Sequence, residues 1–353
     1  MDSQPDQLTF KRYCGFDNHY DQRLVERIRD TIKILGEENS IWEATEKIHG
    51  SHFAITAKRY IDDEDGGEGF TMRAAKRSSF LDWNEKFYNH QKITEKYSVG
   101  VIKALSMVRD KNPDIDQIIV HGEIFGGLYP CDPTKGAIKV QNGIHYSPDN
   151  EWYVFDIHDG TKYLDTDFTT EIFEKCGFFY ARPLHVGTFE EVLQYNNTFN
   201  STIPKLLRSP NWETLGDNIA EGLVLKPRKV LYFTSGSRVM VKSKTDKFLE
   251  RLIAGKSNPT IKEAPPEDPE VEAIWNALSL YITENRLNNV KSKDPSITGK
   301  KLLGPFTADV MDEFTRCHED VELVKSFESM EKKRKGQVTK RLAISSLRLV
   351  NKT

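Results

Sequence analysis

Short apolar runs dominate residues 118–244, and glycine, proline, asparagine and aspartate separate them from one another. Runs of this length, divided by turn-forming residues, predict a system of antiparallel sheets with inserted helices. The pattern changes after a proline-rich acidic stretch at residues 264–269, which marks a boundary. Beyond it, apolar residues recur at helical spacing. The helices expected there cover residues 271–286, 307–330 and 338–350.

Length and patterning together predict two domains, because a chain of 353 residues with ordinary apolar content can bury a sizeable core. We place a β-rich domain at residues 1–258 and an all-helical, charge-rich domain at residues 259–353. Within the first domain, apolar spacing predicts helices over residues 20–35 and 84–109, and Pro113 should end the second.

Composition limits the class of protein and its surroundings. The formal net charge is −3, so a nucleic-acid partner would have to be met by a local basic face. The four cysteines form no Cys-x-x-Cys pair, which predicts reduced thiols in an intracellular protein. No apolar run approaches the roughly 20 residues that cross a bilayer. The N-terminal residues lack a signal or transit pattern, so we expect a protein that is not secreted.

A lysine lies between two short apolar runs, at Lys47 in the sequence EKIHG. A lysine amine must lose a proton before it attacks, and partial burial favours this because desolvation disfavours the charged form. Gly50 has no Cβ, so the chain can turn sharply there and a ligand can approach the backbone. A single Lys-x-x-Gly also occurs by chance in many chains. Lys47 is therefore a candidate nucleophile whose weight depends on the motifs that follow it.

Five further stretches follow Lys47 in order, and most of them begin or end a strand-like run. They combine basic residues, single carboxylates within apolar runs and one aromatic run. They cover residues 72–78, 118–127, 152–157, 220–227 and 238–244.

This ordered set resembles the covalent nucleotidyltransferase superfamily, which contains the polynucleotide ligases and the RNA capping enzymes. Its individual motif sequences are similar to those of the RNA ligase 2 family. This family is the group of the bacteriophage nick-sealing RNA ligase and the mitochondrial RNA-editing ligases. The segments EKIHGSHF, HGEIFGG, WYVFDI, EGLVLK and VKSKTDKF match the family's motifs. One departure is His52, since the family commonly has asparagine there, and it leaves the role of this position open.

The resemblance implies an α+β fold. A nucleotidyltransferase (ATP-grasp-like ligase) domain of antiparallel sheets with flanking helices would precede a small all-helical C-terminal domain, which phage-type enzymes carry where DNA ligases have a β-barrel. The basic cluster at residues 332–335, with Lys340 and Arg341 nearby, suits phosphate contacts and thus a domain that engages nucleic acid. A solvated helix end is the alternative.

The activity implied by the resemblance is that of an ATP-dependent RNA ligase. Lys47 would attack the α-phosphate of ATP to form lysyl-AMP, AMP would pass to a 5′-phosphate end, and a 3′-hydroxyl would displace it. The expected cofactors are ATP and Mg²⁺ or Mn²⁺, because carboxylates and phosphate oxygens are hard ligands. The expected partner is RNA with breaks held in a duplex or an RNA/DNA hybrid, and we expect a monomer.

Charged residues of the later motifs receive roles from the resemblance. Lys242 and Lys244 alternate on a predicted strand, so both side chains leave the same face; the family's equivalent pair contacts the α-phosphate, and the wet face of a strand is the alternative. Glu221 and Glu123 interrupt apolar runs, where a carboxylate is costly unless it binds something. The resemblance assigns Glu221 to metal or catalytic contact and Glu123 to the ribose hydroxyls. Carboxylates satisfied by backbone N–H groups are the alternative.

The nucleotide site implied by the resemblance also includes uncharged residues. Phe155 would stack on adenine, as aromatic faces can, although the sequence alone indicates a core aromatic. Glu46 would read the adenine amino group through its side chain or its backbone. Ile48 and Gly50 belong to the same expected cofactor-binding set.

Two further side chains are expected near phosphates. Arg77 is a fork-shaped donor, and its family counterpart acts after lysine adenylylation, at the nick. His49 would orient the pyrophosphate or the substrate phosphate, or else serve as a structural hydrogen-bonding group.

Two other functions stay open. A DNA ligase or capping guanylyltransferase is disfavoured by His49, where those enzymes usually carry aspartate, and by the helical C-terminal region. A catalytically silent nucleotide- or RNA-end-binding protein of the same fold would show an eroded site. The residues that count against such erosion are Lys47, Glu123, Glu221, Lys242 and Lys244.

Overall fold

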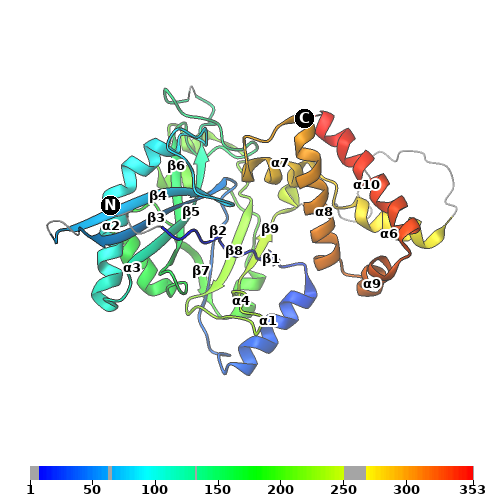
Figure 1. Ribbon diagram of the computed structural model, residues 1–353, viewed down its shortest axis with the longest axis horizontal. Coiled ribbons are helices and arrows are strands. Elements are labelled where there is room, and N and C mark those ends of the chain that lie inside the picture. Colours follow the sequence, from blue (N-terminus) through cyan, green and yellow to red (C-terminus); the bar gives the residue numbers. More distant parts are fainter. Residues whose placement is uncertain (1–7, 63–65, 132, 250–267, 353) are drawn as a thin grey trace, which may run out of the picture. The chain divides into compact units, whose positions relative to one another are not determined.

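The computed structural model describes residues 8–62, 66–131, 133–249 and 268–352 (Figure 1). The chain falls into two compact units. The first comprises Met1–His19 and Leu24–Thr245, and the second comprises Tyr20–Arg23 and Asp246–Thr353. The domain boundary that we predicted after residue 258 lies outside the described residues, so its position stays a prediction.

One sheet of the first unit has four antiparallel strands in the order β4-β3-β5-β6. The strands are β3 (Ser51–Ile61), β4 (Glu68–Lys76), β5 (Gln117–Gly126) and β6 (Asn150–His158). Alternate residues of β3, among them Phe53 and Ile55, join a buried core with Val101 and Leu105 of α2 (His90–Lys111) and with α3 (Thr166–Cys176). The opposite face of this sheet is therefore available for the functional site.

The second sheet of this unit has five strands in the order β1-β9-β8-β2-β7. They are β1 (Asp17–Asn18), β2 (Trp42–Glu46), β7 (Pro183–Gly187), β8 (Gly222–Pro227) and β9 (Val241–Lys244). β1 and β9 are parallel, whereas the other pairs are antiparallel. The prediction of antiparallel sheets is thus confirmed apart from this short edge pair.

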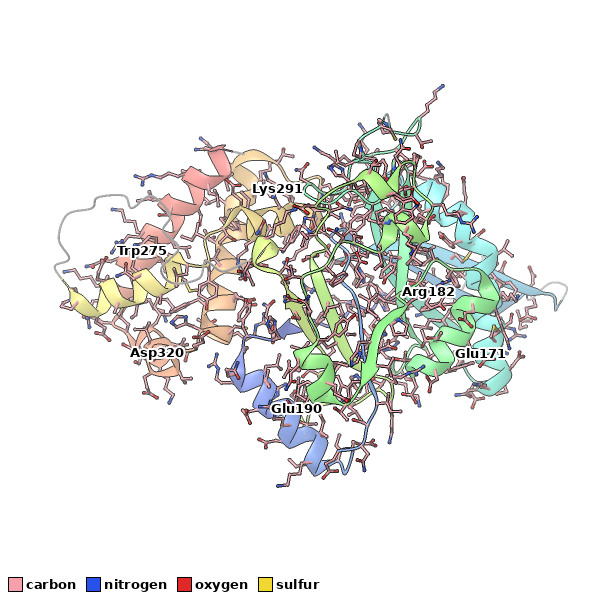
Figure 2. The ribbon with its side chains drawn as sticks, turned by 180° about the vertical axis from the view of Figure 1, so that it is seen from behind. Glu171, Arg182, Glu190, Trp275, Lys291 and Asp320 are labelled. Carbon is pink, nitrogen blue, oxygen red and sulfur yellow. The ribbon has the colours of Figure 1, made fainter. Side chains whose placement is uncertain are left out.

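Helices α1 (Gln22–Ile34) and α4 (Phe189–Gln194) belong to the core of the five-stranded sheet. Leu24, Val25, Ile28 and Ile32 of α1 are buried, as the helical spacing predicted. Glu190 of α4, labelled in Figure 2, accepts hydrogen bonds of 2.7 and 2.9 Å from Arg29 of α1. A short helix α5 (Ile203–Leu206) and 3₁₀ turns at Trp212–Thr214 and Asp246–Phe248 complete the connections.

The start of α2 differs from the prediction. The helix begins at His90 rather than at residue 84. Tyr88 and Asn89 have φ angles of 42° and 60°, and this left-handed conformation cannot continue a right-handed helix. The helix ends at Lys111, before Asn112 and Pro113, as predicted.

The second unit is all helical in its described part, which confirms the predicted class. Its elements are α6 (Pro269–Ser279), α7 (Glu284–Lys293), a 3₁₀ turn at Gly299–Leu302, α8 (Leu303–Cys317), α9 (Val321–Ser329) and α10 (Lys332–Lys352). Their apolar faces form one core, with Tyr281, Phe306 and Phe314 fully buried.

Two of the predicted C-terminal helices are each broken in two. Thr283 caps α7 by accepting a hydrogen bond from the Arg286 N–H, so the predicted helix over residues 271–286 divides before it. Asp320 accepts from the Leu323 N–H and starts α9 in the same way. Threonine and aspartate side chains here compete with the continuing helix for the backbone. No helix in the described part of the chain is both long enough and apolar enough to cross a membrane.

Candidate nucleotide site

A cavity that opens to solvent lies in the first unit, and residues from both sheets line it; its empty volume, open solvent included, is about 570 Å³. The four-stranded sheet contributes from β3, β5 and β6, the five-stranded sheet from β2, β8 and the segment before β9, and the N-terminal segment also contributes. In addition to Lys47, five predicted site residues line the cavity, namely Glu46, Ile48, Arg77, Glu123 and Phe155. The lining residues are Tyr13, Phe16, Thr45, Glu46, Lys47, Ile48, His52, Arg77, Glu123, Tyr153, Phe155, Asp156, Ala181, Val224, Lys226 and Met240.

Lys47 lines this cavity and forms an ion pair with a buried carboxylate. Its Nζ donates to Oε2 of Glu221 at 2.8 Å, and its side chain is 14% exposed. The Nζ of Lys244 lies 2.8 Å from the other oxygen, Oε1. His49 Nδ1 lies 3.6 Å from Oε2. Three predicted site residues, Lys47, His49 and Lys244, therefore lie around the carboxylate of a fourth, Glu221.

The environment of Glu221 favours its charged form. Burial alone would raise the pKa of Glu221, but the ammonium groups of Lys244 and Lys47 hold it well below the usual value. A carboxylate that stays ionised can hold two cations in place. Removal of one cation would leave a buried charge with weaker compensation.

The strand pairing explains how Glu221 reaches the lysines. Lys47 follows β2, and its N–H donates to the carbonyl of Gly222 at 2.9 Å, so β2 and β8 deliver Lys47 and Glu221 side by side. Gly222 has a φ of +143°, and a Cβ there would lie 2.0 Å from the carbonyl oxygen of Ser243. Only glycine permits this close approach of β8 to β9, which carries Lys244.

Gly50 places Glu123 near the lysine. Its N–H donates to Oε2 of Glu123 at 3.0 Å, and a Cβ at Gly50 would lie 2.4 Å from the carbonyl oxygen of Ile124. A close approach to the Gly50 backbone is thus made by β5, whereas the approach of a ligand there stays a prediction. Burial raises the pKa of Glu123, and the nearby Lys47 ammonium opposes this rise.

Both carboxylate oxygens of Glu46 are already hydrogen-bonded to protein groups, so its side chain is not positioned for the adenine contact that we considered. Oε1 accepts from the Ser201 hydroxyl at 2.5 Å, and Oε2 accepts from the N–H and hydroxyl of Thr202 at 2.8 and 2.7 Å. Burial raises the pKa of Glu46, and these hydrogen bonds oppose it. Of the two possibilities for adenine recognition, the geometry favours the backbone of Glu46.

Arg77 and Phe155 both line the cavity. Burial, followed by the nearby Arg12, lowers the pKa of Arg77, and its Nε has no hydrogen-bond partner among the described residues. Phe155 makes an edge contact with Tyr13 at a centroid distance of 5.3 Å. A guanidinium Nε without a described partner and an aromatic side chain in the same cavity both suit a phosphate-bearing aromatic ligand.

Lys242 does not line the cavity, and neither do four other predicted site residues, namely His49, Gly50, Glu221 and Lys244. Lys242 lies on β9, two residues before Lys244, where alternation gives both side chains one face. Its carbonyl accepts from the His19 N–H at 2.8 Å, and Asn18 of β1 is its register partner.

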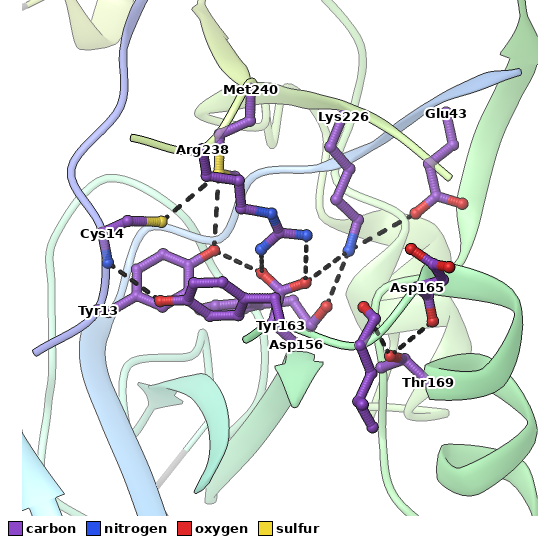
Figure 3. Close-up of polar contacts among 12 residues, drawn as sticks. Tyr13, Cys14, Glu43, Asp156, Tyr163, Asp165, Thr169, Lys226, Arg238 and Met240 are labelled. Carbon is purple, nitrogen blue, oxygen red and sulfur yellow. Dashed lines mark hydrogen bonds and ion pairs between the residues drawn. The ribbon is translucent and has the colours of Figure 1, made fainter. Parts of the chain in front are cut away.

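A second buried ionic cluster, which the sequence did not predict, borders the cavity (Figure 3). Asp156 accepts two hydrogen bonds from Arg238, at 2.7 and 3.0 Å, and one from Lys226 at 3.1 Å. The Tyr13 hydroxyl donates to Asp156 Oδ2 at 2.5 Å. Burial alone would raise the pKa of Asp156, but Arg238 and Lys226 hold it below its usual value. The sequence did contain an indication of this cluster, because an aspartate inside the apolar run WYVFDI requires a cationic partner.

The N-terminal segment forms one wall of the cavity. Thr9 exchanges two hydrogen bonds with the Gln117 side chain, of 2.9 and 3.1 Å. Tyr13 and Phe16 line the cavity, and β1 then pairs with β9. The segment therefore connects one sheet to the other across the site. No motif in the sequence indicated this role.

Two buried histidines lie against Tyr13. The His52 ring stacks on Tyr13 at 5.4 Å, and the His121 ring lies 5.0 Å from it. Neither ring nitrogen of either histidine has a hydrogen-bond partner among the described residues. Burial lowers the pKa of His52 well below its usual value and that of His121 to about 3. Both rings are therefore neutral near pH 7.

Comparison with known families identifies the class of this chain. The family described as RNA ligase matches residues 40–244, more than half of the chain, and the one described as T4 RNA ligase 2 C-terminal matches residues 266–345. The chain therefore belongs to the RNA ligase family. The second match confirms the resemblance to the RNA ligase 2 group, and with it the nucleotidyltransferase fold followed by a helical C-terminal region.

Particular relatives belong to the same class. RNA-editing ligase 2, mitochondrial, of Trypanosoma brucei brucei is 27% identical over 364 residues, covering 87% of this chain and 83% of the relative. RNA-editing ligase 1, mitochondrial, of the same organism is 24% identical over 355 residues, covering 84% and 72%.

Comparison with solved structures finds mutants of a Naegleria gruberi RNA ligase. One, with AMP and Mn, has a TM-score of 0.43 at 16% identity, covering 68% of this chain. This chain spans 57% of the Naegleria chain.

Proposed function

We propose that this protein is an ATP-dependent RNA ligase that joins 5′-phosphate and 3′-hydroxyl ends, at breaks held in duplex RNA or RNA/DNA hybrids. The observation that carries the proposal is the position of Lys47. Its side chain lines the cavity that both sheets border, and its amine lies 2.8 Å from a carboxylate that also binds Lys244. Membership of the RNA ligase family supports this assignment.

The chemistry requires an activated 5′ end, because a bare phosphate does not expel an oxide leaving group. The Lys47 amine attacks the α-phosphorus of ATP, forms the N–P bond of lysyl-AMP, and expels pyrophosphate. The terminal 5′-phosphate then attacks the same phosphorus and frees the lysine. The 3′-hydroxyl finally attacks the 5′-phosphate and expels AMP. Positioning and charge neutralisation supply most of the acceleration of such transfers.

Several residues around Lys47 would bind the nucleotide. Lys244, with Lys242 on the same strand, would contact the α-phosphate, and Glu123 would bind the ribose hydroxyls. Phe155 would stack on adenine, with Glu46 reading the base through its backbone. The direct ion pair of Lys244 with Glu221 keeps this cation within reach of any phosphate that Lys47 attacks.

Other residues of the candidate site would bind or position phosphates. His49, 3.6 Å from Glu221, would orient the pyrophosphate, and Ile48 and Gly50 would shape the wall beside it. Arg77 would act after lysine adenylylation, by binding the 5′-phosphate end at the nick. Its unpartnered Nε supports a role as a phosphate donor.

A divalent cation would be held by carboxylate and phosphate oxygens together. Glu221 uses one position on each oxygen for an ammonium group, and a carboxylate has about four lone-pair positions. No group of three histidine, cysteine or carboxylate ligand atoms that includes Glu221 converges among the described residues. This donor set fits Mg²⁺ or Mn²⁺, which bind through one or two carboxylates plus substrate phosphates. The bound cation would neutralise charge on the phosphates.

The wider setting completes the proposal. We infer a monomer that acts on RNA inside the cell, with no membrane association. Residues 1–258 would form the adenylyltransferase domain, and residues 259–353 would form a helical domain that engages nucleic acid. The match of residues 266–345 to the T4 RNA ligase 2 C-terminal family supports a separate C-terminal domain.

The test is labelling with α-labelled ATP and magnesium, followed by denaturing electrophoresis and mass mapping. We expect an acid-labile AMP adduct on Lys47, formed from ATP and not from GTP. Lys47→Arg keeps the cation beside Glu221 but has no nucleophilic amine, so it should take up no label. Lys229→Ala removes an exposed lysine that pairs with Glu37 and serves as the matched control.

The opposite result would favour a silent binding protein. Wild-type protein is first treated with pyrophosphate, which removes any AMP already attached to the lysine. If the treated protein then takes up no label, the enzyme proposal fails. Sealing of a 5′-labelled nicked RNA duplex by the labelled protein tests the later steps.

A further inference from the structure

We propose that one face of α10, formed by Lys333, Lys340 and Arg348 and called here the α10 stripe, binds the phosphate backbone of RNA. The inference rests on the proposed function in one respect, which is that RNA is the substrate. It adds a surface that the ligase chemistry of the first unit does not require.

The composition of α10 is strongly one-sided. Its sequence, KKRKGQVTKRLAISSLRLVNK, contains eight lysines and arginines and no aspartate or glutamate. The whole chain has a formal net charge of −3. The helix is therefore a local excess of positive charge on a chain that is slightly acidic overall.

Three of these basic residues are used to attach α10 to its neighbours. Arg334 donates to both oxygens of Asp268 at 2.7 Å, and Arg341 donates to Glu272 at 2.6 Å. Arg341 also packs over Trp275 of α6 at 4.6 Å from the ring centroid (Trp275 is labelled in Figure 2). The Lys335 ammonium lies 4.7 Å from the Phe327 ring centroid. These contacts are structural, and they leave the other cations to be explained.

The α10 stripe has no such partners. Lys333, Lys340 and Arg348 are exposed, and none forms an ion pair with another described residue. At about 100° per residue they lie within roughly 80° of one another around the helix. At about 1.5 Å per residue they extend over roughly 23 Å along it. Three cations in a row on one rigid face suit a polymer with regularly repeated negative charges.

RNA fits this face better than a membrane does. An amphipathic helix that lies in a membrane inserts its apolar side. In α10 the apolar side, with Val338, Leu342 and Val350, is buried in the core of the second unit. On the same face, Ile344 is 43% exposed, but this single apolar side chain is no membrane-inserting surface, and the stripe otherwise presents charge, which is typical of phosphate-backbone contact.

The test compares RNA binding by two charge-reversal variants. K333E/K340E/R348E changes the stripe, and K300E/K301E/K325E makes the same change of charge at other exposed lysines of the second unit. Affinity for a fluorescent nicked RNA duplex is measured at several salt concentrations, and thermal unfolding is followed for each variant. K333R/K340R/R348K keeps the charge and should keep binding.

We expect the stripe variant to bind about tenfold more weakly or worse at ~0.1 M salt. Its slope of log affinity against log salt should fall by about 2 to 3, because each phosphate contact contributes about 0.9. The loss should be similar for different RNA sequences. An unchanged slope, or an equal fall in the control variant, would overturn the proposal. So would intact RNA binding with lost binding to phosphatidylserine vesicles. Because binding is measured without ligation, these outcomes are separate from failure of the labelling experiment.

Discussion

Glu221 and Asp156 are both almost fully buried, and each lies between two cations in the first unit. In both cases burial would raise the pKa of the carboxyl, and the neighbouring cations instead lower it. The two clusters differ in the kind of cation. Glu221 has two lysines, which are point charges on flexible stems, whereas Asp156 has an arginine fork that binds both of its oxygens.

The partners also differ in exposure. The Lys47 side chain is 14% exposed at the cavity, whereas the other three partners, Lys244, Arg238 and Lys226, are only 3%, 1% and 4% exposed. A lysine that must react has to leave its ion pair during the cycle, and an ammonium can do so toward the cavity. The arginine of the second cluster has no such exit. The comparison indicates that one buried pair is exchangeable and the other is fixed.

The largest expected effect is on the rate of lysyl-AMP formation. Glu221→Gln leaves Lys47 and Lys244 without the carboxylate that holds them, so we expect the rate to fall by about 100-fold or more. Single-turnover labelling with α-labelled ATP measures it. Glu190→Gln, at an exposed glutamate that pairs with Arg29, is the matched control and should keep the wild-type rate. A Glu221→Gln variant as fast as this control would show that the two clusters do not differ in kind.

The next effect is on the free energy of unfolding. Asp156→Asn leaves Arg238 buried without its counter-charge and leaves Lys226 with only Glu43, 3.8 Å away, and breaking a buried pair costs about 3–5 kcal/mol. Glu221→Gln should cost less, roughly 1–3 kcal/mol, because Lys47 can turn toward the cavity. Urea denaturation of both variants, with the slope of each transition compared, measures the difference. Equal losses would remove the distinction between an exchangeable and a fixed pair.

The smallest effect is on the pH dependence of the free energy of unfolding. It arises from two histidines, one of which is the register partner of Asp156. Burial lowers the pKa of His121, the register partner of Asp156, to about 3 and that of His158 to about 4. In the unfolded chain these histidines bind protons near pH 6.5, before they can do so in the folded protein. The free energy of unfolding is therefore highest above that pH and falls as the pH drops. Each histidine should contribute a fall of about 1.4 kcal/mol per pH unit between roughly pH 6 and 4.

His121→Gln removes one of these two contributions. Unfolding free energies at pH 7, 6 and 5 should therefore decline less steeply in this variant, by about 1.4 kcal/mol per unit. Tyr163→Phe changes the packing against the same ring without removing an imidazole, so it should keep the steeper decline. A His121→Gln variant with the wild-type slope would contradict the assignment.

The sequence predicted the members of the first cluster but not those of the second. Lys47, Glu221 and Lys244 each lie in a motif, and the order of the motifs placed them in one site. For Asp156 the motif was visible, but its partners were not. Arg238 and Tyr13 lie 82 and 143 residues away from it, and although Arg238 begins one of the motif stretches, no local pattern pairs either residue with Asp156. Contacts of this kind are set by how strands pair, which periodicity does not specify.

The same limit applies to helix boundaries. Apolar spacing predicted α1 and the end of α2 because both depend on local side chains and on a proline. It missed the start of α2, where the backbone at Tyr88 and Asn89 is left-handed. It also missed the break before Thr283, since a capping side chain can interrupt an apolar repeat without disturbing its spacing.

The parallel pairing of β1 with β9 has a consequence for synthesis on the ribosome. Asn18 pairs with Lys242, so the first strand of the unit meets its partner only after more than 200 further residues have been made. At about 5–20 residues per second, this takes roughly 10 to 45 s. Throughout that time the emerging chain carries Tyr13 and Phe16 with no β9 to hold them. The nucleotide cavity therefore gains its final wall late, when the first and the last strands of the sheet join.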